Sequence, residues 1–247
     1  MGIMQKKTNF INDFYKWKRT VNKFNRYDDK SPLLQLLYRN SEIFEYKINS
    51  GSYFYRGRIF DIDDIVSTNK EYIDFIDSKE KTFVGYNKKD SGAPPLKIAT
   101  EGRLNGKGVS FLYTCNNVET VIYELRPTRD ERISIAEFVT KKDLIFADLT
   151  KNKLKNIQNA TLYDLLNNIS NEFSTPHYAG HNYWFTQYLA GQFINMGFDG
   201  IIFESSLNPK GENFVFFYPS DCEALRSKLY EVNDIFISFE EISRRDL

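Results

Sequence analysis

Apolar residues near the start of the chain recur at helical spacing. Phe10, Phe14, Trp17, Val21 and Phe24 follow one another at alternating intervals of four and three residues, which places all five on one face of a helix. Such a stripe usually packs against the protein core, and we interpret it so rather than as a membrane or partner helix. The pattern therefore predicts an amphipathic N-terminal helix.

Helix and strand signals follow one another along the rest of the chain. Ser31 is placed as an N-cap and Pro32 as the first residue of a second, leucine-rich helix. Asn116 and Glu119 are placed as a capping box at the start of a later helix. Further helices are predicted over residues 116–125, 154–169 and 183–196. Strands are predicted over residues 43–48, 53–56, 109–114, 133–138, 144–148, 201–204, 214–218 and 235–239.

This order of elements predicts a mixed α/β (α+β) fold. Residues 79–108 are rich in Lys, Gly, Pro, Asn and Asp, and we interpret them as an ordered loop region rather than a linker. The sequence contains no repeat and no low-complexity segment. We predict one domain over residues 43–247, preceded by a helical extension over residues 1–42.

The composition is that of a globular protein with balanced charge. Of 247 residues, 41% are hydrophobic and 27% are charged, which excludes a mainly disordered chain. The 33 Lys and Arg residues match 33 Asp and Glu residues, so the formal net charge is zero. General nucleic-acid or membrane-surface binders usually carry an excess of positive charge, and we therefore expect neither activity.

The two cysteines and the N-terminus point to a reducing compartment. Cys115 and Cys222 lie far apart, and the sequence leaves open whether they form one disulfide, but their spacing matches no zinc site. The first residues lack the apolar run of a signal peptide, and Lys6 breaks the myristoylation pattern. No apolar stretch is long enough to span a bilayer. We expect a soluble, cytoplasmic protein.

Two arginine-containing segments are candidates for binding an anion. Arg56 and Arg58 end a short aromatic strand, and Arg103 lies in the glycine-rich loop of residues 102–108. This loop is not a P-loop, because it lacks the four-residue gap and the Ser or Thr that follows the lysine. Exposed glycine amides beside an arginine can cradle an anion, but a solvated surface turn fits the same spacing.

The remaining polar candidates are weak when taken singly. Glu124 lies on the flank of an apolar helix, where a carboxylate can enter a pocket or remain solvated. Ser205 and Ser206 end a strand, a frequent position for ligand contacts. His177 and His181 have the spacing of a helical metal pair, but their surroundings read as a loop and no third ligand is evident, so we predict no metal site.

Taken in order, several segments resemble the RES domain, a family named for its Arg, Glu and Ser residues. The resemblance extends from about residue 53 to residue 218 and does not cover the helical extension. Its segments are Tyr55-Arg56-Gly57-Arg58, Gly92-Ala93-Pro94-Pro95, Glu101-Gly102-Arg103-Leu104-Asn105, Gly108-Val109-Ser110-Phe111-Leu112-Tyr113, Glu119-Thr120-Val121-Ile122-Tyr123-Glu124-Leu125-Arg126-Pro127, Thr186-Gln187, Gly197-Phe198-Asp199-Gly200-Ile201, Glu204-Ser205-Ser206 and Asn213-Phe214-Val215-Phe216-Phe217. One departure is Leu104, because the family usually has an aromatic residue there.

The resemblance implies a fold similar to ADP-ribosyltransferases and NAD⁺ as the substrate. Family members are typically toxins of bacterial toxin–antitoxin pairs, acting as NAD⁺ phosphorylases, NAD⁺ glycohydrolases or ADP-ribosyltransferases. An antitoxin or other protein inhibitor is therefore an expected partner. By position, the resemblance implies catalytic roles for Arg56, Arg103 and Glu124. It implies substrate binding by Tyr113, Ser205, Asn105 and Asn213.

These residue types suit cleavage of the nicotinamide–ribose bond. Nicotinamide is cationic in NAD⁺ and leaves as a neutral ring, so one carboxylate near the ribose can suffice, whereas ordinary glycosidases need two. Arginines bind pyrophosphate or an attacking phosphate in a bidentate way. No cofactor is expected beyond NAD⁺ as substrate, with inorganic phosphate as a possible co-substrate. Transfer of ADP-ribose to a macromolecule and a non-catalytic NAD-binding module remain alternatives.

Overall fold

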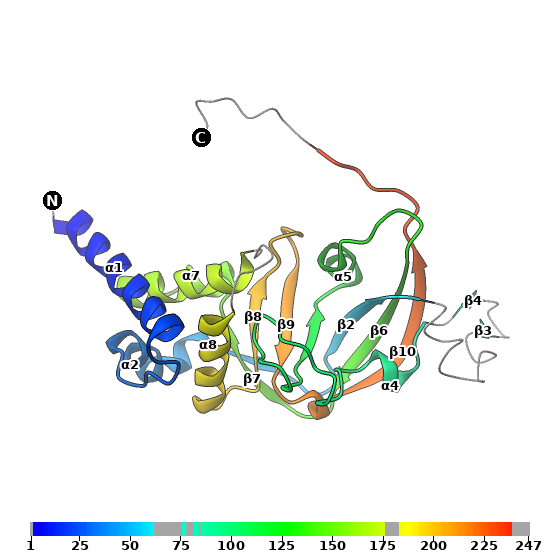
Figure 1. Ribbon diagram of the computed structural model, residues 1–247, viewed down its shortest axis with the longest axis horizontal. Coiled ribbons are helices and arrows are strands. Elements are labelled where there is room, and N and C mark those ends of the chain that lie inside the picture. The colour runs from blue at the N-terminus through cyan, green and yellow to red at the C-terminus, as the bar shows by residue number, and fades with distance from the viewer. Residues whose placement is uncertain (1, 62–75, 78–81, 84, 176–182, 239–247) are drawn as a thin grey trace.

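A computed structural model describes residues 2–61, 76–77, 82–83, 85–175 and 183–238 (Figure 1). Its centre is an eight-stranded mixed sheet with the strand order β1-β7-β8-β9-β5-β2-β6-β10. Only β7 and β8 pair in parallel; the other neighbours are antiparallel. The strands are β1 (Glu45–Ile48), β2 (Tyr53–Ile59), β5 (Leu112–Cys115), β6 (Arg132–Thr140), β7 (Leu144–Asp148), β8 (Gly200–Glu204), β9 (Glu212–Phe216) and β10 (Cys222–Glu231). A separate two-stranded sheet pairs β3 (Ile76–Asp77) with β4 (Thr82–Phe83).

Helices are gathered mainly beside the β7–β8–β9 part of the sheet, and α5 lies apart from them near β2 (Figure 1). This arrangement confirms the predicted mixed α/β architecture. The helices are α1 (Gly2–Lys23), α2 (Pro32–Arg39), α4 (Lys88–Ser91), α5 (Val118–Leu125), α6 (Lys151–Leu154), α7 (Ala160–Ser174) and α8 (Trp184–Asn195). Two short 3₁₀ helices are η1 (Ser41–Phe44) and η3 (Pro219–Asp221). No described helix is long and apolar enough to cross a membrane.

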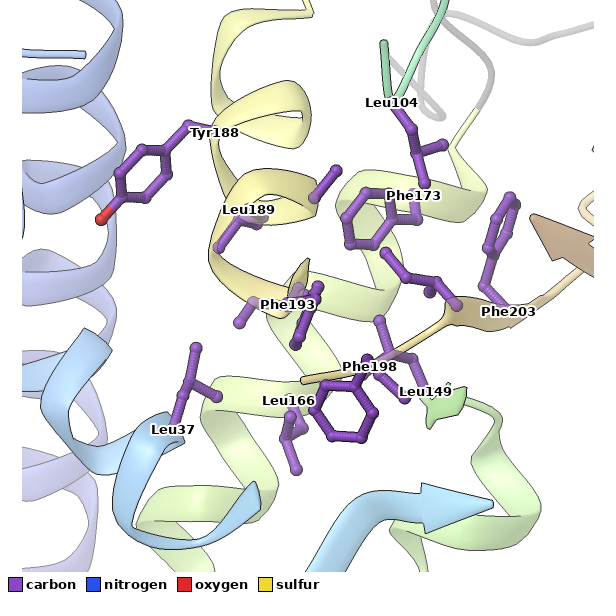
Figure 2. Close-up of a cluster of buried hydrophobic side chains, with 14 of the residues drawn as sticks. Leu37, Leu104, Leu149, Leu166, Phe173, Tyr188, Leu189, Phe193, Phe198 and Phe203 are labelled. Atoms are coloured by element: carbon purple, nitrogen blue, oxygen red, sulfur yellow. The ribbon is translucent and has the colours of Figure 1, made fainter. Parts of the chain in front are cut away.

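The largest apolar cluster joins the N-terminal helices to α7, α8 and the sheet. Phe14, Trp17 and Val21 of α1 are buried there, as the stripe predicts. Figure 2 shows Leu37 of α2 in the same cluster, together with side chains from α7 and α8. Phe24 is 73% exposed, because α1 ends at Lys23 and releases the chain from the helical face. The first two helices thus share their core with the sheet, while the domain limit at residue 42 stays a prediction.

Several predicted elements have different limits in the structure. The N-cap of α5 is Asn117, whose side chain accepts a hydrogen bond from the backbone N–H of Thr120, so the predicted capping box at Asn116 and Glu119 was wrong by one residue. The helix predicted over 154–169 begins later and ends later, because α6 ends at Leu154 and α7 runs from its own N-cap, Asn159, to Ser174.

The end of the chain also differs from the prediction. Residues 235–238 have no regular structure, and residue 239 lies outside the described residues. The last strand is instead β10 at the edge of the sheet, paired along β6. Its charged residues face solvent on an edge strand and hid the alternating pattern in the sequence. Cys115 and Cys222 are both free and buried. His177 and His181 lie outside the described residues, which hold no group of three metal-ligating side chains.

Helix α5 lies directly on β2 because Gly57 has no side chain. A Cβ atom at this position would lie 2.7 Å from Leu125 Cδ1 and closer still to Val121 Cγ1. Cβ contacts of this kind essentially never occur, so a larger residue must displace the side chains of Val121 and Leu125 or the helix that carries them. The glycine therefore fixes how closely α5 approaches the sheet.

We expect Gly57→Ala to destabilise the fold by about 1–3 kcal/mol, the usual cost of overpacking a well-packed contact. Denaturant unfolding followed by circular dichroism measures it. Gly191→Ala on α8 is the matched control, because its Cβ would meet nothing within 4 Å. The control should stabilise the protein by about 0.5–1 kcal/mol through helix propensity. An unchanged unfolding midpoint for Gly57→Ala would contradict the close approach of α5.

Candidate active site

A cleft of about 240 Å³ opens beside α5, where two neighbouring strands of the sheet separate. Strands β2 and β5 pair at a single position, Tyr55 with Cys115. Beyond that pair the strands diverge, and side chains from both strands line the space. Predicted site residues that line the cleft are Arg56, Arg103, Tyr113, Glu124 and Asn213. Residues spread over the chain therefore converge on one site.

Glu124 is held at one of its two carboxylate oxygens. It lies in the last turn of α5, and its Oε1 accepts hydrogen bonds from Ser205 Oγ at 2.7 Å and Asn213 Nδ2 at 2.8 Å. The described residues supply no hydrogen bond to Oε2, and the residue is exposed. The carboxylate is thus oriented through one oxygen while the other remains available to a ligand.

Ser205 supports Glu124 from outside the lining of the cleft. Its Oγ accepts hydrogen bonds from the backbone N–H groups of Leu207 at 3.1 Å and Asn208 at 3.0 Å. A hydroxyl has a single proton, so these two acceptor contacts leave that proton for Glu124. Ser205 is buried, whereas Ser206 lines the cleft. The serine predicted to bind substrate therefore contacts the glutamate, and the next serine faces the ligand space.

A polar network ties the same loop to the start of α5. Asn208 Nδ2 donates to Thr120 Oγ1 at 3.0 Å, and Thr120 Oγ1 donates to Asn117 Oδ1 at 2.9 Å. The amide of Asn213 is fixed from its other side, because Cys115 Sγ donates to its Oδ1 at 3.3 Å. Burial raises the pKa of the Cys115 thiol to about 12, with the nearby Glu124 acting in the same direction, so the thiol stays protonated as a donor.

Arg56 brings a buried positive charge to the floor of the cleft. Its Nη1 donates to the backbone carbonyl of Tyr113 at 3.2 Å, and its buried Nε has no hydrogen-bond partner among the described residues. Burial, and secondly the charge of Arg58, lowers the pKa of Arg56 from 12.5 to about 10. Guanidinium groups remain charged at neutral pH even so, and an unpaired buried donor is costly. An anionic ligand would satisfy both the charge and the spare donor.

Arg103 is anchored by two helix ends. Its Nη1 donates to the carbonyl of Phe173 in the last turn of α7, and its own carbonyl accepts a hydrogen bond from Thr186 Oγ1 of α8 at 2.5 Å. Carbonyls in a last turn lack intrahelical partners, and the helix dipole favours a cation there. Burial lowers the pKa of Arg103, while the neighbouring Tyr183 and Glu124 oppose the shift.

The glycine loop around Arg103 is ordered by an amide and a phenol. Tyr113 OH donates to Asn105 Oδ1 at 2.7 Å and accepts from the backbone N–H of Leu104 at 3.2 Å. Asn105 is buried and does not line the cleft, so its contacts organise the loop. Gly102 allows this packing, because a Cβ there would lie 2.5 Å from Asn105 Oδ1. Burial raises the pKa of Tyr113 to about 12, which keeps the phenol protonated.

Some contributors were not identified in the sequence. Gln187 of α8 donates from Nε2 to the carbonyls of Gly102 and Asn105 at 3.0 and 3.1 Å, which secures the loop from the other side. Arg126 lines the cleft as the C-cap of α5, in a left-handed conformation with φ of 50°. Arg58 faces elsewhere and donates to the carbonyl of Asp90 at 2.6 Å. Arg126 lies in the same RES-like segment as Glu124, two residues further on, but nothing in the sequence assigned it to the site.

Comparison with known protein families agrees with the resemblance to the RES domain seen in the sequence segments. The sequence model of the RES domain family matches residues 82–234. The chain belongs to the RES domain family. The match spans all the predicted site residues except Arg56, which lies on β2 before it. The helical extension also precedes the matched part of the RES domain.

Among solved structures, the chain resembles one from the crystal structure of the M. tuberculosis MbcT–MbcA toxin–antitoxin complex. The TM-score is 0.46 with 10% sequence identity, and the match covers 79% of this chain and 92% of that chain. No curated protein matches the sequence.

Proposed function

We propose that this RES domain protein cleaves the bond between nicotinamide and ribose in NAD⁺, with phosphate or water as the acceptor. The observation that carries the proposal is the pairing of one oriented carboxylate, Glu124, with two largely buried arginines in a single cleft. The substrate class comes from the family, and the cleft contains side chains suited to the ribose and to the phosphates of NAD⁺.

Glu124 is suited to stabilising the ribose during bond cleavage. As the glycosidic bond breaks, positive charge develops on the ribose ring, and a nearby carboxylate stabilises it. The free oxygen of Glu124 can hold a ribose hydroxyl while Ser205 and Asn213 keep the carboxylate in place. Nicotinamide leaves as a neutral molecule and takes no proton, so the site requires no second carboxylate as an acid.

Arg56 and Arg103 are suited to binding the phosphates. Their guanidinium groups suit the pyrophosphate of NAD⁺ or an attacking inorganic phosphate, and the spare Nε of Arg56 provides a donor for it. Arg126 adds a third positive charge to the lining. Tyr113 also lines the cleft, with its hydroxyl already engaged by the loop, and can offer its ring to the nicotinamide or the adenine.

Product analysis tests the proposal. The purified protein is incubated with NAD⁺, with and without inorganic phosphate, and the products are separated by chromatography and identified by mass spectrometry. ADP-ribose 1″-phosphate that forms only with phosphate supports phosphorolysis, and free ADP-ribose supports hydrolysis. A labelled macromolecule in cell extract would instead support ADP-ribosyl transfer. NAD⁺ that stays intact under all three conditions would refute the enzymatic proposal.

We further propose that a protein antitoxin blocks the cleft. An enzyme that consumes NAD⁺ in the cytoplasm harms its own cell unless it is inhibited, and the family is typically found in toxin–antitoxin pairs. Induced expression of the chain alone should therefore stop growth and lower cellular NAD⁺. Normal growth with unchanged NAD⁺, at a level of soluble protein confirmed by immunoblot, would contradict the toxin assignment.

Ser205→Ala should lower turnover of NAD⁺ about 10-fold, because it removes the hydroxyl that orients Glu124 while keeping the carboxylate. The change also leaves the buried N–H of Asn208 and the partly buried N–H of Leu207 without their acceptor, so we expect a stability loss of about 1–3 kcal/mol. Steady-state kinetics below the unfolding temperature measures the first effect. Ser206→Ala is the matched control on the cleft wall, and it should keep both stability and Glu124 geometry. Wild-type turnover in Ser205→Ala would contradict the positioning role of Ser205.

A further inference from the structure

We infer that Lys18 of α1 and Glu172 of α7 form a pair of positioning residues for Arg103. Through Lys18, the helical extension then helps to position a side chain that lines the cleft. The inference rests on the proposed function only for its kinetic test, because the placement of Arg103 can be measured without any ligand. It assigns a role to Lys18, which precedes the matched part of the RES domain, through its contact with Glu172 inside that part.

Arg103 is held by contacts from two helices. Its guanidinium is fixed by the carbonyl of Phe173 at the end of α7, and its backbone by Thr186 at the start of α8. The position of the charge in the cleft therefore depends on where these two helix ends lie relative to each other. The residues that connect the two helices, 176–182, lie outside the described part of the chain.

Helix α1 contacts the end of α7 one residue from the first anchor. Lys18 Nζ lies 2.6 and 2.7 Å from the two carboxylate oxygens of Glu172, and Glu172 directly precedes Phe173. The two side chains are 25% and 15% exposed, so the pair is largely shielded from water. With both carboxylate oxygens within hydrogen-bond distance of one ammonium group, the pair ties α1 closely to the end of α7.

The same face of α1 contacts the start of α8 one residue from the second anchor. The ring of Phe185, which directly precedes Thr186, lies edge to face with Trp17 at 5.2 Å and with Phe14 at 5.7 Å between centroids. Figure 2 shows Tyr188, one turn further along α8, pointing toward the neighbouring helix. Its ring lies 6.0 Å from that of Trp17. Successive residues of α1, Trp17 and Lys18, thus reach both helix ends.

The aromatic contacts and the ion pair of α1 differ in how much the fold depends on them. The aromatic contacts belong to the buried core, and removing them would unfold the region before it reported on the site. The ion pair lies at the border of that core, so it can be removed with a smaller effect on folding. Lys18 and Glu172 are therefore the residues with which a positioning role can be tested.

The test compares Lys18→Met, Glu172→Gln and the double variant with the wild type. We expect KM for NAD⁺ to rise about 5-fold in each single variant, within the range of coupling through packed elements, with a smaller change in kcat. The double variant should lose no more than the worse single variant, because the two residues act as a pair. Lys142→Met is the matched control: it removes an ion pair with Asp221 of 3.2 Å whose residues do not line the cleft, and its kinetics should be unchanged.

A ligand-free measurement makes the inference independent of the proposed function. The Nε–H signal of Arg103, assigned with an Arg103→Lys variant, is recorded by NMR in each folded protein. It should shift or broaden in Lys18→Met and Glu172→Gln and stay in place in Lys142→Met. If the wild type leaves NAD⁺ intact but the signal responds in this way, the proposed function fails and the positioning role stands. An Arg103 signal that is identical in Lys18→Met and the wild type overturns the inference.

Discussion

Glu124→Gln is expected to lower the turnover of NAD⁺ by about 10²-fold or more, the scale of losing one electrostatic stabiliser in an active site. Glutamine keeps the size of the side chain, and its Oε1 can still accept the hydrogen bonds from Ser205 and Asn213. Only the negative charge opposite the ribose is removed. Because that charge acts mainly in the transition state, KM should change much less than kcat. Steady-state kinetics with NAD⁺ separates the two.

Glu119→Gln supplies the control for that experiment. Glu119 lies on the same helix, is exposed and does not line the cleft. Its loss changes the net charge of α5 equally, so the kinetics of this variant should match the wild type. If Glu124→Gln cleaved NAD⁺ at the rate of Glu119→Gln, the catalytic carboxylate would lie elsewhere or the reaction would be a different one.

Arg56→Met is expected to change activity and stability in opposite directions. Losing the buried guanidinium should lower kcat/KM for NAD⁺ by about 10²-fold, because charge-assisted phosphate contacts are strong and the site is shielded from water. The fold should gain about 1–2 kcal/mol, since an apolar side chain replaces a buried charge with an unsatisfied Nε. The lowered pKa of Arg56, about 10, means that burial disfavours the charged form. That cost is present in full below about pH 10, including neutral pH, and declines as pH rises toward 12.5.

Kinetics and denaturant unfolding at neutral pH test both halves of this prediction. Arg58→Met is the control on the same strand, because Arg58 donates to the carbonyl of Asp90 and does not line the cleft. It should leave kcat/KM unchanged. A stability loss in Arg56→Met would show that the arginine is a structural residue, and retained activity would exclude it from phosphate binding.

Much of the fold follows from local signals in the sequence. The stripe from Phe10 to Phe24 predicted α1 because its residues recur at the helical period, although the helix ends before Phe24. Strand β7, Leu144–Asp148, was predicted with its observed limits. Strand β10 was missed because an edge strand carries charged residues outward, and this masks the period of two.

The candidate site was predictable in its membership but not in its internal arrangement. The ordered series of segments predicts a common site for Arg56, Arg103 and Glu124, and all three line the cleft. Sequence could not place Ser205 outside the cleft lining, since that depends on two hydrogen bonds from a loop that follows it. Nor could it identify Arg126, because the left-handed cap that positions it is decided by how α5 ends.

The contact of α5 with Gly57 limits how the cleft can be redesigned. Arg56 immediately precedes that glycine, and α5, which rests on it, carries Glu124. The approach of the helix to the strand is therefore set by the side chains of Val121 and Leu125, which occupy the place that a Cβ at position 57 would take. Engineering this scaffold for a longer or shorter substrate would require moving the strand or the helix as a whole. Substitutions in the lining can alter which ligand binds, but they leave the approach of α5 to β2 unchanged.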